Sequence, residues 1–504
     1  MSINLFNSIK ATRPKYNVFD LSHDVKLSTD MGTLTPIMLM DVVPGDKISI
    51  GTESLLRFMP MISPAMHRIN AYFHYFFVPN RILWDGWEGF ITNQVPVSDR
   101  AFPFVTVGGS FQTPLCDYLG IPPRSTAGNG SAMNLNAFPF AVYQKVWADY
   151  YRDQNQQVDP EAWKLIDGDN TFNAGSALFG LKNRAWEHDY FTAALPTAQK
   201  GSPVSLPLGR VELDPDVFSE GRLVNATDHS PATGAVTGAS GALNVNATAA
   251  TYDPAGTLII NPTTINDLRR AYKLQEWLEK AIRGGVRLFE VIWSQFGVKS
   301  PDARLQRAEY ITGSSSPVII SEVLNTTGTA DLPQGNMAGH GVSVTSSHQG
   351  SYYVQEHGYI IGIMSILPRT AYMQGIEKHW FKTTDPFDYF WPPFANIGEQ
   401  EVLSKEVFAF DDGNNDTVFG YVPRYAEYKF MNNRVAGDFR TSLDFWHLAR
   451  KFTTTPVLNE SFIVSDPSTR IFSVDTPETN TMWCHVYNKV KAVRGMPKFG
   501  TPSF

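Results

Sequence analysis

Apolar and polar positions along the chain alternate in short blocks that predict β-strands separated by long connections. Residues 28–50 indicate two strands divided by a turn at Pro44-Gly45. Further strands are expected at 358–367, 417–422 and 482–493. Because tens of residues separate many of these strands, the connections have room for helices and long loops.

The stretch 72–90, YFHYFFVPNRILWDGWEGF, contains eight Phe, Tyr or Trp side chains among nineteen residues. Residues 66–78 predict a strand that is apolar on both faces and therefore needs cover on both sides. Pro79 ends this strand, and Trp84 and Trp87 are expected in a loop or a short helical turn. What covers so much aromatic surface is the first question that the sequence raises.

Apolar positions recur at helical spacing in several other segments. The clearest segment is 264–297, which we interpret as a helical insertion of two helices. Thr264 is suited to cap the first helix, and Gly284-Gly285 is suited to stop it. Shorter helices are expected at 138–152, 183–191 and 441–452.

Residues 225–256 differ from their surroundings because they are small, polar, rich in Gly, Ala and Thr, and nearly free of aromatic side chains. Such a composition is typical of an exposed insertion. We place the bounds of this surface insertion at 200–262, within a single domain that covers 1–504.

Composition supports a mainly β fold. The chain has 504 residues, 13% of which are aromatic, with 38 Gly and 33 Pro, and these residue types favour strands joined by turns and loops. A two-sheet jelly roll with elaborated connections fits the pattern, although the pattern alone does not require it.

Charge is unevenly distributed. The formal net charge is −7, which excludes a protein that binds nucleic acid through a basic charge over its whole surface. Both ends of the chain are nevertheless locally basic, so they are either solvated tails or contacts to a polyanion. The basic residues are Lys10, Arg13 and Lys15 near the N-terminus, and Lys489, Lys491, Arg494 and Lys498 near the C-terminus.

Motifs for catalysis or cofactor binding are missing, so we expect neither an enzyme nor a resident cofactor or metal. The sequence has no P-loop, HExxH or GxSxG motif. Its two cysteines, Cys116 and Cys484, cannot form a disulfide framework or a CxxC zinc pattern. His340, His348, Glu356 and His357 suggest a cupin-like metal site, but ordinary strand and loop histidines are the favoured interpretation. The sequence also predicts no secretory signal and no membrane span, which fits a reducing cytoplasm.

Several long motifs resemble, in the same order, blocks of the major capsid proteins of the Microviridae, which are small single-stranded DNA bacteriophages. The similarity is best to the gokushovirus branch, and 266–313 carries its longest block. The other motifs are VVPGD (42–46), FFVPNRILWDGW (76–87), EHGYIIGIMSI (356–366), FDYFWPPFANIGEQ (387–400), FGYVPRYAEYKF (419–430), SLDFWHLARKF (442–452) and YNKVKAVRGMPKFGTP (487–502).

This resemblance implies an eight-stranded viral jelly roll with long, partly helical insertions. It implies a structural protein of the virion, of which sixty copies, made and assembled in the bacterial cytoplasm, form a T=1 icosahedral shell around circular single-stranded DNA. The implied partners are other copies of the chain, an internal scaffolding protein, a pilot protein, a small basic DNA-binding protein and a host surface receptor.

The resemblance also suggests roles for particular residues. The 200–262 insertion lies where gokushoviruses form a protrusion at each threefold axis that is implicated in host attachment. Its candidate residues are Asn225, His229, Thr237, Asn244 and Asn246. The basic residues of both termini become candidates for DNA contact.

Trp84, Trp87 and Phe90 are candidates for a contact with a neighbouring subunit, because aromatic side chains are enriched at interfaces. The alternative for Trp84 and Trp87 is a place in the core of their own chain. For the whole protein, the alternative function is a carbohydrate-binding jelly-roll protein, because aromatic platforms and Asn/Asp-rich loops suit sugars.

Overall fold

The computed structural model describes most of the chain outside the termini and several loops. It covers residues 15–92, 100–107, 113–122, 133–172, 177–202, 204, 211–213, 222–225, 250–253, 258–260, 264–285, 287–324, 337–345, 349–409, 413, 415–474 and 479–499. The chain divides into two compact units, residues 1–198 with 284–504 and residues 199–283.

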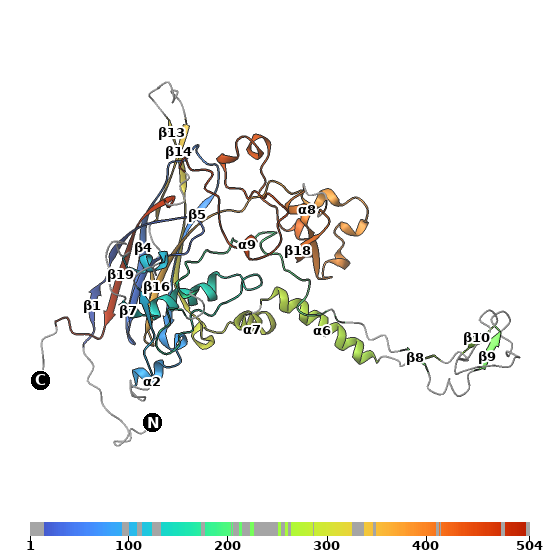
Figure 1. Ribbon diagram of the computed structural model, residues 1–504, viewed down its shortest axis with the longest axis horizontal. Helices are drawn as coiled ribbons and strands as arrows, with labels where there is room; N and C mark the ends of the chain where they lie inside the picture. The colour runs from blue at the N-terminus through green and yellow to red at the C-terminus, as the bar shows by residue number, and fades with distance from the viewer. Residues whose placement is uncertain are drawn as a thin grey trace, which may run out of the picture. The chain divides into compact units, whose positions relative to one another are not determined.

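The first unit contains a large antiparallel sheet built around β4 and β19, which pair along nearly their whole length. Figure 1 shows β4, in blue, beside β19, in red, so the N-terminal and C-terminal parts of the chain meet in this sheet. The seven strands are β1 (Asn17–Asp20), β2 (His23–Thr29), β4 (Lys47–Phe58), β13 (Ile319–Leu324), β14 (Met337–Thr345), β15 (Gly350–Tyr353) and β19 (Met482–Arg494).

Two positions of this sheet are each shared by two strands. β1 and β2 pair with successive parts of the free edge of β19. β15 and β14 pair in the same way with the outer edge of β4, and β13 pairs with β14 beyond them. The sheet therefore has four main positions and one additional edge strand.

The second sheet has four antiparallel strands in the order β12-β5-β16-β3. They are β3 (Thr35–Val42), β5 (Ile69–Pro79), β12 (Glu309–Pro317) and β16 (Gly358–Pro368). The strands predicted at 28–50, 358–367, 417–422 and 482–493 are confirmed, with small differences at their ends.

β5 answers the question of what covers the aromatic stretch. Phe73, Tyr75 and Phe77 point into the core between the two sheets. Phe76 and Val78 point to the opposite face, where a second apolar cluster covers them. The prediction of a strand apolar on both faces is therefore confirmed, and both faces are covered within the chain.

The cover on the second face comes from a helix that changes its geometry part-way. α4 (Phe138–Val146) continues directly into the π-helix η1 (Trp147–Tyr151). Phe76 of β5 packs against Tyr150, with ring centroids 4.7 Å apart. The helix predicted at 138–152 thus exists, but its last turn is widened, as is common near functional or strained positions.

A buried polar bridge crosses the core between the two sheets. The Tyr75 hydroxyl on β5 donates to Asn488 Oδ1 on β19 at 2.7 Å and lies 2.5 Å from Thr52 Oγ1 on β4. Asn488 Nδ2 donates to the Ile37 carbonyl on β3 at 2.9 Å. Tyr75 is 2% exposed and Asn488 is 0% exposed, and burial raises the pKa of the Tyr75 hydroxyl well above its usual range. The bridge therefore links four strands from both sheets through direct hydrogen bonds.

Smaller elements surround the two sheets in the first unit. Two strand pairs are β6 (Phe104–Val107) with β7 (Met133–Asn136), and β17 (Glu399–Leu403) with β18 (Val418–Pro423). The helices are α1 (Asn80–Leu83), α2 (Trp87–Ile91), α3 (Pro114–Tyr118), α7 (Leu288–Phe296), α8 (Ser404–Val407) and α9 (Glu460–Ile463). The 3-10 turns are η3 (Asp302–Leu305), η4 (Lys378–Phe381), η5 (Pro386–Asp388), η6 (Pro392–Phe394), η7 (Ala426–Tyr428), η8 (Gly437–Arg440) and η9 (Asp444–Trp446).

Two predicted helices are wrong. At 183–191 the chain is irregular, because the Asp189 carboxylate accepts from the backbone N–H groups of Phe191 and Thr192 and holds a local turn. At 441–452 only the 3-10 turn η9 forms, and the chain after it is extended. Aromatic spacing resembles helical periodicity in both segments, but these side chains anchor loops.

The described residues of the second unit include one long helix and two strand pairs. α6 (Ile265–Arg283) is capped by Thr264, whose Oγ1 accepts from the Asp267 N–H at 3.2 Å. With α7, it confirms the two helices predicted within 264–297. The strand pairs are β8 (Val211–Leu213) with β11 (Leu258–Ile260), and β9 (Arg222–Asn225) with β10 (Ala250–Asp253).

We expect Asn488→Leu to lower the free energy of unfolding by about 2–4 kcal/mol, because the buried Ile37 carbonyl loses the Asn488 hydrogen bond and the Tyr75 hydroxyl keeps only Thr52 as a partner. Denaturant unfolding of the purified full-length chain measures this change. Tyr75→Phe is the matched single variant. The double variant should cost clearly less than the sum of the two single variants, since both ends of the bond are then removed. Strict additivity would show that the two groups do not stabilise the core together.

Candidate assembly and nucleic-acid surfaces

The three aromatic residues predicted at a subunit interface lie beside the core of their own chain. Trp84 is 2% exposed, and its indole N–H donates to Asp167 Oδ1 at 2.7 Å. Its ring is therefore covered within one chain, which favours the intrachain alternative for this residue. Trp87 and Phe90 pack partly against the same cluster. A contact between these two residues and a neighbouring subunit stays a prediction.

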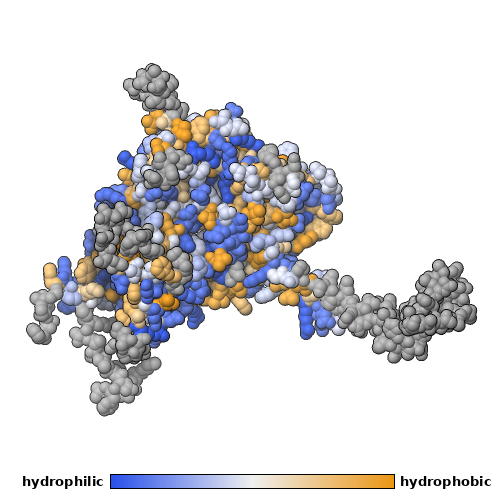
Figure 2. Space-filling model, viewed as in Figure 1, coloured by the Kyte–Doolittle hydropathy of each residue, from blue (hydrophilic) through white to orange (hydrophobic). Residues whose placement is uncertain are grey.

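A different aromatic segment is far more exposed. Trp380 is 68% exposed, and Met431 on an adjoining loop is 84% exposed. About half of each neighbouring ring is exposed in the following set: Phe387, Tyr389, Phe390 and Trp391. Figure 2 shows apolar residues reaching the surface in several separate groups. The run FDYFWPPF was a sequence signal for this surface, but its aromatic content alone did not distinguish an interface from a core.

α7 is a second exposed apolar element. None of its nine residues is buried, and Leu288, Trp293 and Phe296 are all more than half exposed. Lys299 lies over the Trp293 ring, 5.1 Å from its centroid. A helix with this much uncovered apolar surface is typical of a docking element.

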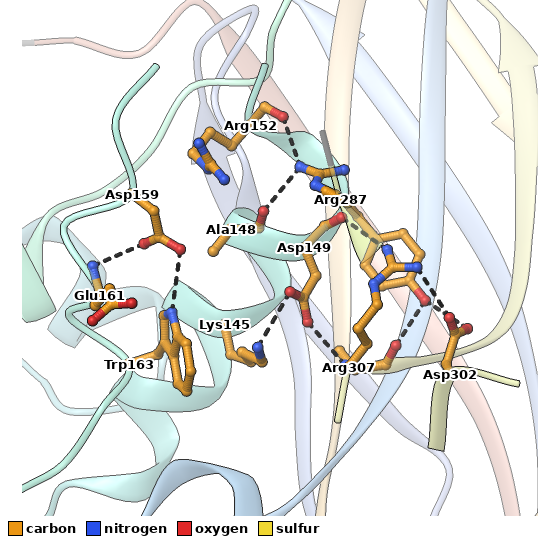
Figure 3. Close-up of polar contacts among 12 residues, drawn as sticks. Lys145, Ala148, Asp149, Arg152, Asp159, Glu161, Trp163, Arg287, Asp302 and Arg307 are labelled. Atoms are coloured by element: carbon orange, nitrogen blue, oxygen red, sulfur yellow. Dashed lines mark hydrogen bonds and ion pairs between the residues drawn. The ribbon is translucent and has the colours of Figure 1, made fainter. Parts of the chain in front are cut away.

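Charged side chains tie the start of α7 to the π-helix η1 (Figure 3). Arg287 Nη2 donates to the carbonyl oxygens of Ala148 and Arg152, each at 3.0 Å. Burial lowers the pKa of the Arg287 guanidinium. These bonds satisfy carbonyl groups at the C-terminal end of the helix, where the helix dipole favours a cation.

The same close-up shows a second arginine, Arg307, that contacts η1 (Figure 3). Arg307 forms an ion pair with Asp302, with 3.1 Å between Nη1 and Oδ1, and donates to the Asp149 carbonyl at 3.0 Å. The Asp149 carboxylate accepts from Lys145 and from the Ala308 N–H. Both arginines are thus occupied by structural contacts and hold η1 in place.

The basic termini come together at one end of the large sheet. Asn17 pairs with Arg494 in the register of β1 and β19, and Asn17 Nδ2 donates to the carbonyl oxygens of Lys15 and Met496. Residues at opposite ends of the sequence therefore place their positive charges side by side. Lys10 and Arg13 lie outside the described residues.

Several of the predicted DNA-contact residues already have carboxylate partners. Arg494 Nε lies 2.9 Å from Oδ2 of the buried Asp46, and Lys489 forms an ion pair with Glu53. Lys491 lies opposite Asp20 and lowers its pKa in part, after the larger effect of hydrogen bonds from Ser22. Lys15 and Lys498 are exposed and, among the described residues, have no side-chain partner. Of the described members of the predicted set, these two lysines are the ones without a carboxylate nearby.

The candidate receptor-loop residues are mostly outside the described part of the chain. Asn225 ends β9, and its backbone lies opposite Ala250. His229, Thr237, Asn244 and Asn246 lie outside the described residues.

Of the four residues considered for a metal site, Glu356 and His357 have other contacts, and His348 lies outside the described residues. Glu356 binds Arg81 through both carboxylate oxygens, at 2.8 and 3.0 Å, and His357 packs edge-on against Trp87. Among the described residues, no group of three or more His, Cys, Asp or Glu is placed to hold a metal ion. Within the same residues, no helix is both long and apolar enough to cross a membrane.

Comparison with known proteins identifies the family. A family model described as capsid protein (F protein) matches residues 7–504. The chain belongs to the phage F capsid protein family. It is 34% identical to capsid protein VP1 of Bdellovibrio phage phiMH2K, over 98% of this chain and 96% of that protein. It is 32% identical to capsid protein VP1 of Chlamydia phage 1, over 99% and 97%, and 29% identical to that of Spiroplasma virus 4, over 92% and 90%.

Membership of the F capsid protein family confirms the resemblance to gokushovirus-like capsid proteins of the Microviridae. The chain is a structural component of the virion and not an enzyme. The exposed aromatic segment and α7 are therefore exposed surfaces of a self-assembling capsid protein. The carbohydrate-binding alternative loses its support.

We expect Arg287→Met to loosen α7 from the π-helix, because two charge-assisted hydrogen bonds to carbonyl groups are lost. Hydrogen exchange of the amides in 288–296 should accelerate by about tenfold or more, measured by mass spectrometry. Arg304→Met is the matched control, because Arg304 is exposed and its guanidinium has no partner among the described residues. Equal exchange rates in wild type and Arg287→Met would show that other contacts hold the helix.

Proposed function

We propose that this capsid protein folds as an eight-stranded viral jelly roll with long, partly helical insertions. The strand order supports this proposal. Successive strands along the chain alternate between the sheets except at β5 and β12, which neighbour each other. The eight positions, in chain order, are β1/β2, β3, β4, β5, β12, β14/β15, β16 and β19, with β13 as an addition. Two four-position antiparallel sheets with this alternation match a jelly roll.

We propose further that sixty copies of the chain form a T=1 shell around circular single-stranded DNA. The observation that carries this proposal is the exposed aromatic segment around Trp380. A single chain gains little from exposing so many large rings, whereas obligate interfaces bury on the order of 2,000–5,000 Å² and are core-like. Twofold, threefold and fivefold contacts in a closed shell require several such surfaces on each subunit.

The basic ends of the chain are the proposed DNA contacts. Lys15 and Lys498 remain available for phosphate, Lys491 lies opposite Asp20, and Arg494 and Lys489 form ion pairs within the chain. A protein with a net charge of −7 binds DNA only through such local groups. A small basic DNA-binding protein, an internal scaffolding protein and a pilot protein complete the proposed set of viral partners.

Residues 200–262 are the proposed threefold protrusion, which would contact a host surface receptor. Two nested antiparallel strand pairs support this proposal. The pair β8 and β11 lies outside the pair β9 and β10 in the sequence, so both ends of the insertion are held together at its base. Residues 226–249, which connect β9 to β10 in the sequence, lie outside the described residues.

We expect the protein, produced together with its viral partners, to sediment as nuclease-resistant particles of sixty-subunit mass, with an absorbance ratio at 260 and 280 nm that indicates DNA. Replacing Trp380 and Met431 with Ser should keep the chain folded and prevent these particles, because the two side chains are mostly exposed before assembly. An unchanged thermal unfolding midpoint is the control for folding. A wild-type protein that stays small and free of DNA would contradict the proposal.

We expect phage in which a two-residue Asn-Gly turn replaces residues 226–249 to assemble normally and fail to adsorb. Asn225 and Ala250 are directly opposed, so a two-residue turn can close the β9–β10 hairpin without disturbing its base. Particle yield and the titre of unadsorbed phage measure the two effects. A variant with the same 24 positions shuffled separates sequence from length and should also fail to adsorb. Normal adsorption of the shortened phage would remove the attachment role.

A further inference from the structure

A cavity of about 320 Å³ lies where three distant parts of the chain meet: the segment before β5, the segment after β16 and the loop that contains η8. Its lining residues include three arginines, two histidines and no acidic residue. They are Met66, His67, Arg68, Arg369, Ala371, Asn433, Arg434, Val435, Ala436, Phe439 and His447. The charge of this cavity is the reverse of the charge of the whole chain.

Two of the three arginines are available to a ligand. Arg369 forms an ion pair with Glu187. Arg68 and Arg434 are exposed, and in the part of the chain that the structure describes their guanidinium groups have no hydrogen-bond or ion-pair partner. Behind the cavity, Arg470 donates to the Ala449 carbonyl at 2.7 Å and lies close to His447. The nearby Asp444 carboxylate, which also pairs with Lys451, partly offsets the charge of Arg470. Guanidinium groups with no carboxylate opposite them favour a phosphate ligand.

The two histidines position the cavity wall. His67 adds no charge to it at neutral pH. His67 Nε2 donates to the Arg369 carbonyl at 2.6 Å, and burial lowers the pKa of His67 to about 4. His447 Nδ1 accepts from the Ala449 N–H, so its Nε2 carries the proton that is donated to the Phe439 carbonyl at 2.8 Å. Each imidazole thus fixes the backbone of a residue that lines the cavity.

The rest of the wall is apolar and aromatic. Phe439 is partly exposed, and its ring packs edge-on against Trp446 with centroids 6.3 Å apart. Val435 and Ala436 adjoin it in the lining. An aromatic face beside free guanidinium groups suits a ligand that has both a flat ring and a phosphate, and a base stacked on such a ring contributes about 1–3 kcal/mol.

We propose that this cavity binds one nucleotide of single-stranded DNA, with its phosphate at Arg68 and Arg434 and its base against Phe439. The volume lies at the lower end of the range for small-molecule sites, which fits one nucleotide. The proposal rests on the proposed function, because it assigns one contact to the genome that the shell would enclose. Unlike the basic termini, this site offers shape and stacking in addition to charge.

The test measures binding of a fluorescein-labelled ten-nucleotide oligothymidylate to the purified, unassembled full-length chain, by anisotropy at several salt concentrations. Arg68→Gln with Arg434→Gln should weaken binding by at least tenfold and reduce the slope of log affinity against log salt by about one to two. Phe439→Leu should weaken binding and leave the slope unchanged, since it removes stacking and no charge. This difference separates a nucleotide site from general charge attraction.

Arg57→Gln with Arg304→Gln is the matched control, because it removes two exposed arginines outside the cavity. It should change the affinity by less than about twofold. Thermal unfolding of each variant checks that the fold is kept. Unlabelled oligothymidylate should displace the probe at far lower concentrations than inorganic phosphate or polyglutamate.

Unchanged binding in the Arg68/Arg434 variant, or equal displacement by phosphate or polyglutamate, would overturn the nucleotide site. The particle experiment stays independent of this result. If wild-type particles form but the cavity variants bind the oligonucleotide normally, the nucleotide site is rejected and the shell is kept. If the chain forms no particles but the variants change oligonucleotide binding as expected, the shell is rejected and the nucleotide site is supported.

Discussion

The hydrogen bonds around the Tyr75 hydroxyl hold the two sheets of this protein in one relative position. Apolar packing between the sheets is strong but tolerates sliding, whereas a buried hydroxyl that must reach Asn488 and Thr52 on the opposite sheet allows one register. Asn488 extends this constraint to β3 through the Ile37 carbonyl. The constraint therefore joins strands from the N-terminal and C-terminal parts of the first unit.

The two faces of β5 are covered by different parts of the chain. One face of this strand belongs to the core between the sheets, and the other face needs a separate cover, which α4 and the π-helix η1 provide. Widening of the last helical turn leaves carbonyl groups that Arg287 and Arg307 satisfy. The same arginines lie at the base of α7, so the exposed apolar helix is fixed to the core through the cover of β5. A rigid docking helix loses less conformational entropy on assembly than a mobile helix does.

Some basic residues of this chain are paired with carboxylates, and others are not. The chain is acidic overall, yet two of the four basic residues near its C-terminus, Lys489 and Arg494, pair with carboxylates. Among the described residues, positive charge without a carboxylate partner occurs at the adjoining termini and in the cavity lined by Arg68 and Arg434, among other places. A capsid protein arranged in this way can contact phosphate locally without the mutual repulsion that a uniformly basic shell would produce.

The sequence by itself determined the strands with clear turn signals, the two helices within 264–297, the double-faced character of β5 and, through long ordered motifs, the capsid family. These features depend on local periodicity, turn chemistry or family resemblance, which a linear sequence carries. Only the tertiary structure decided that Trp84 is covered within its own chain, that Arg494 is used by Asp46, and that 183–191 is a turn and not a helix. It also brought Arg68 beside Arg434, which lies more than three hundred residues further along the chain. Such neighbours are set by the pairing of distant strands, and no local pattern specifies which side chains that pairing brings together.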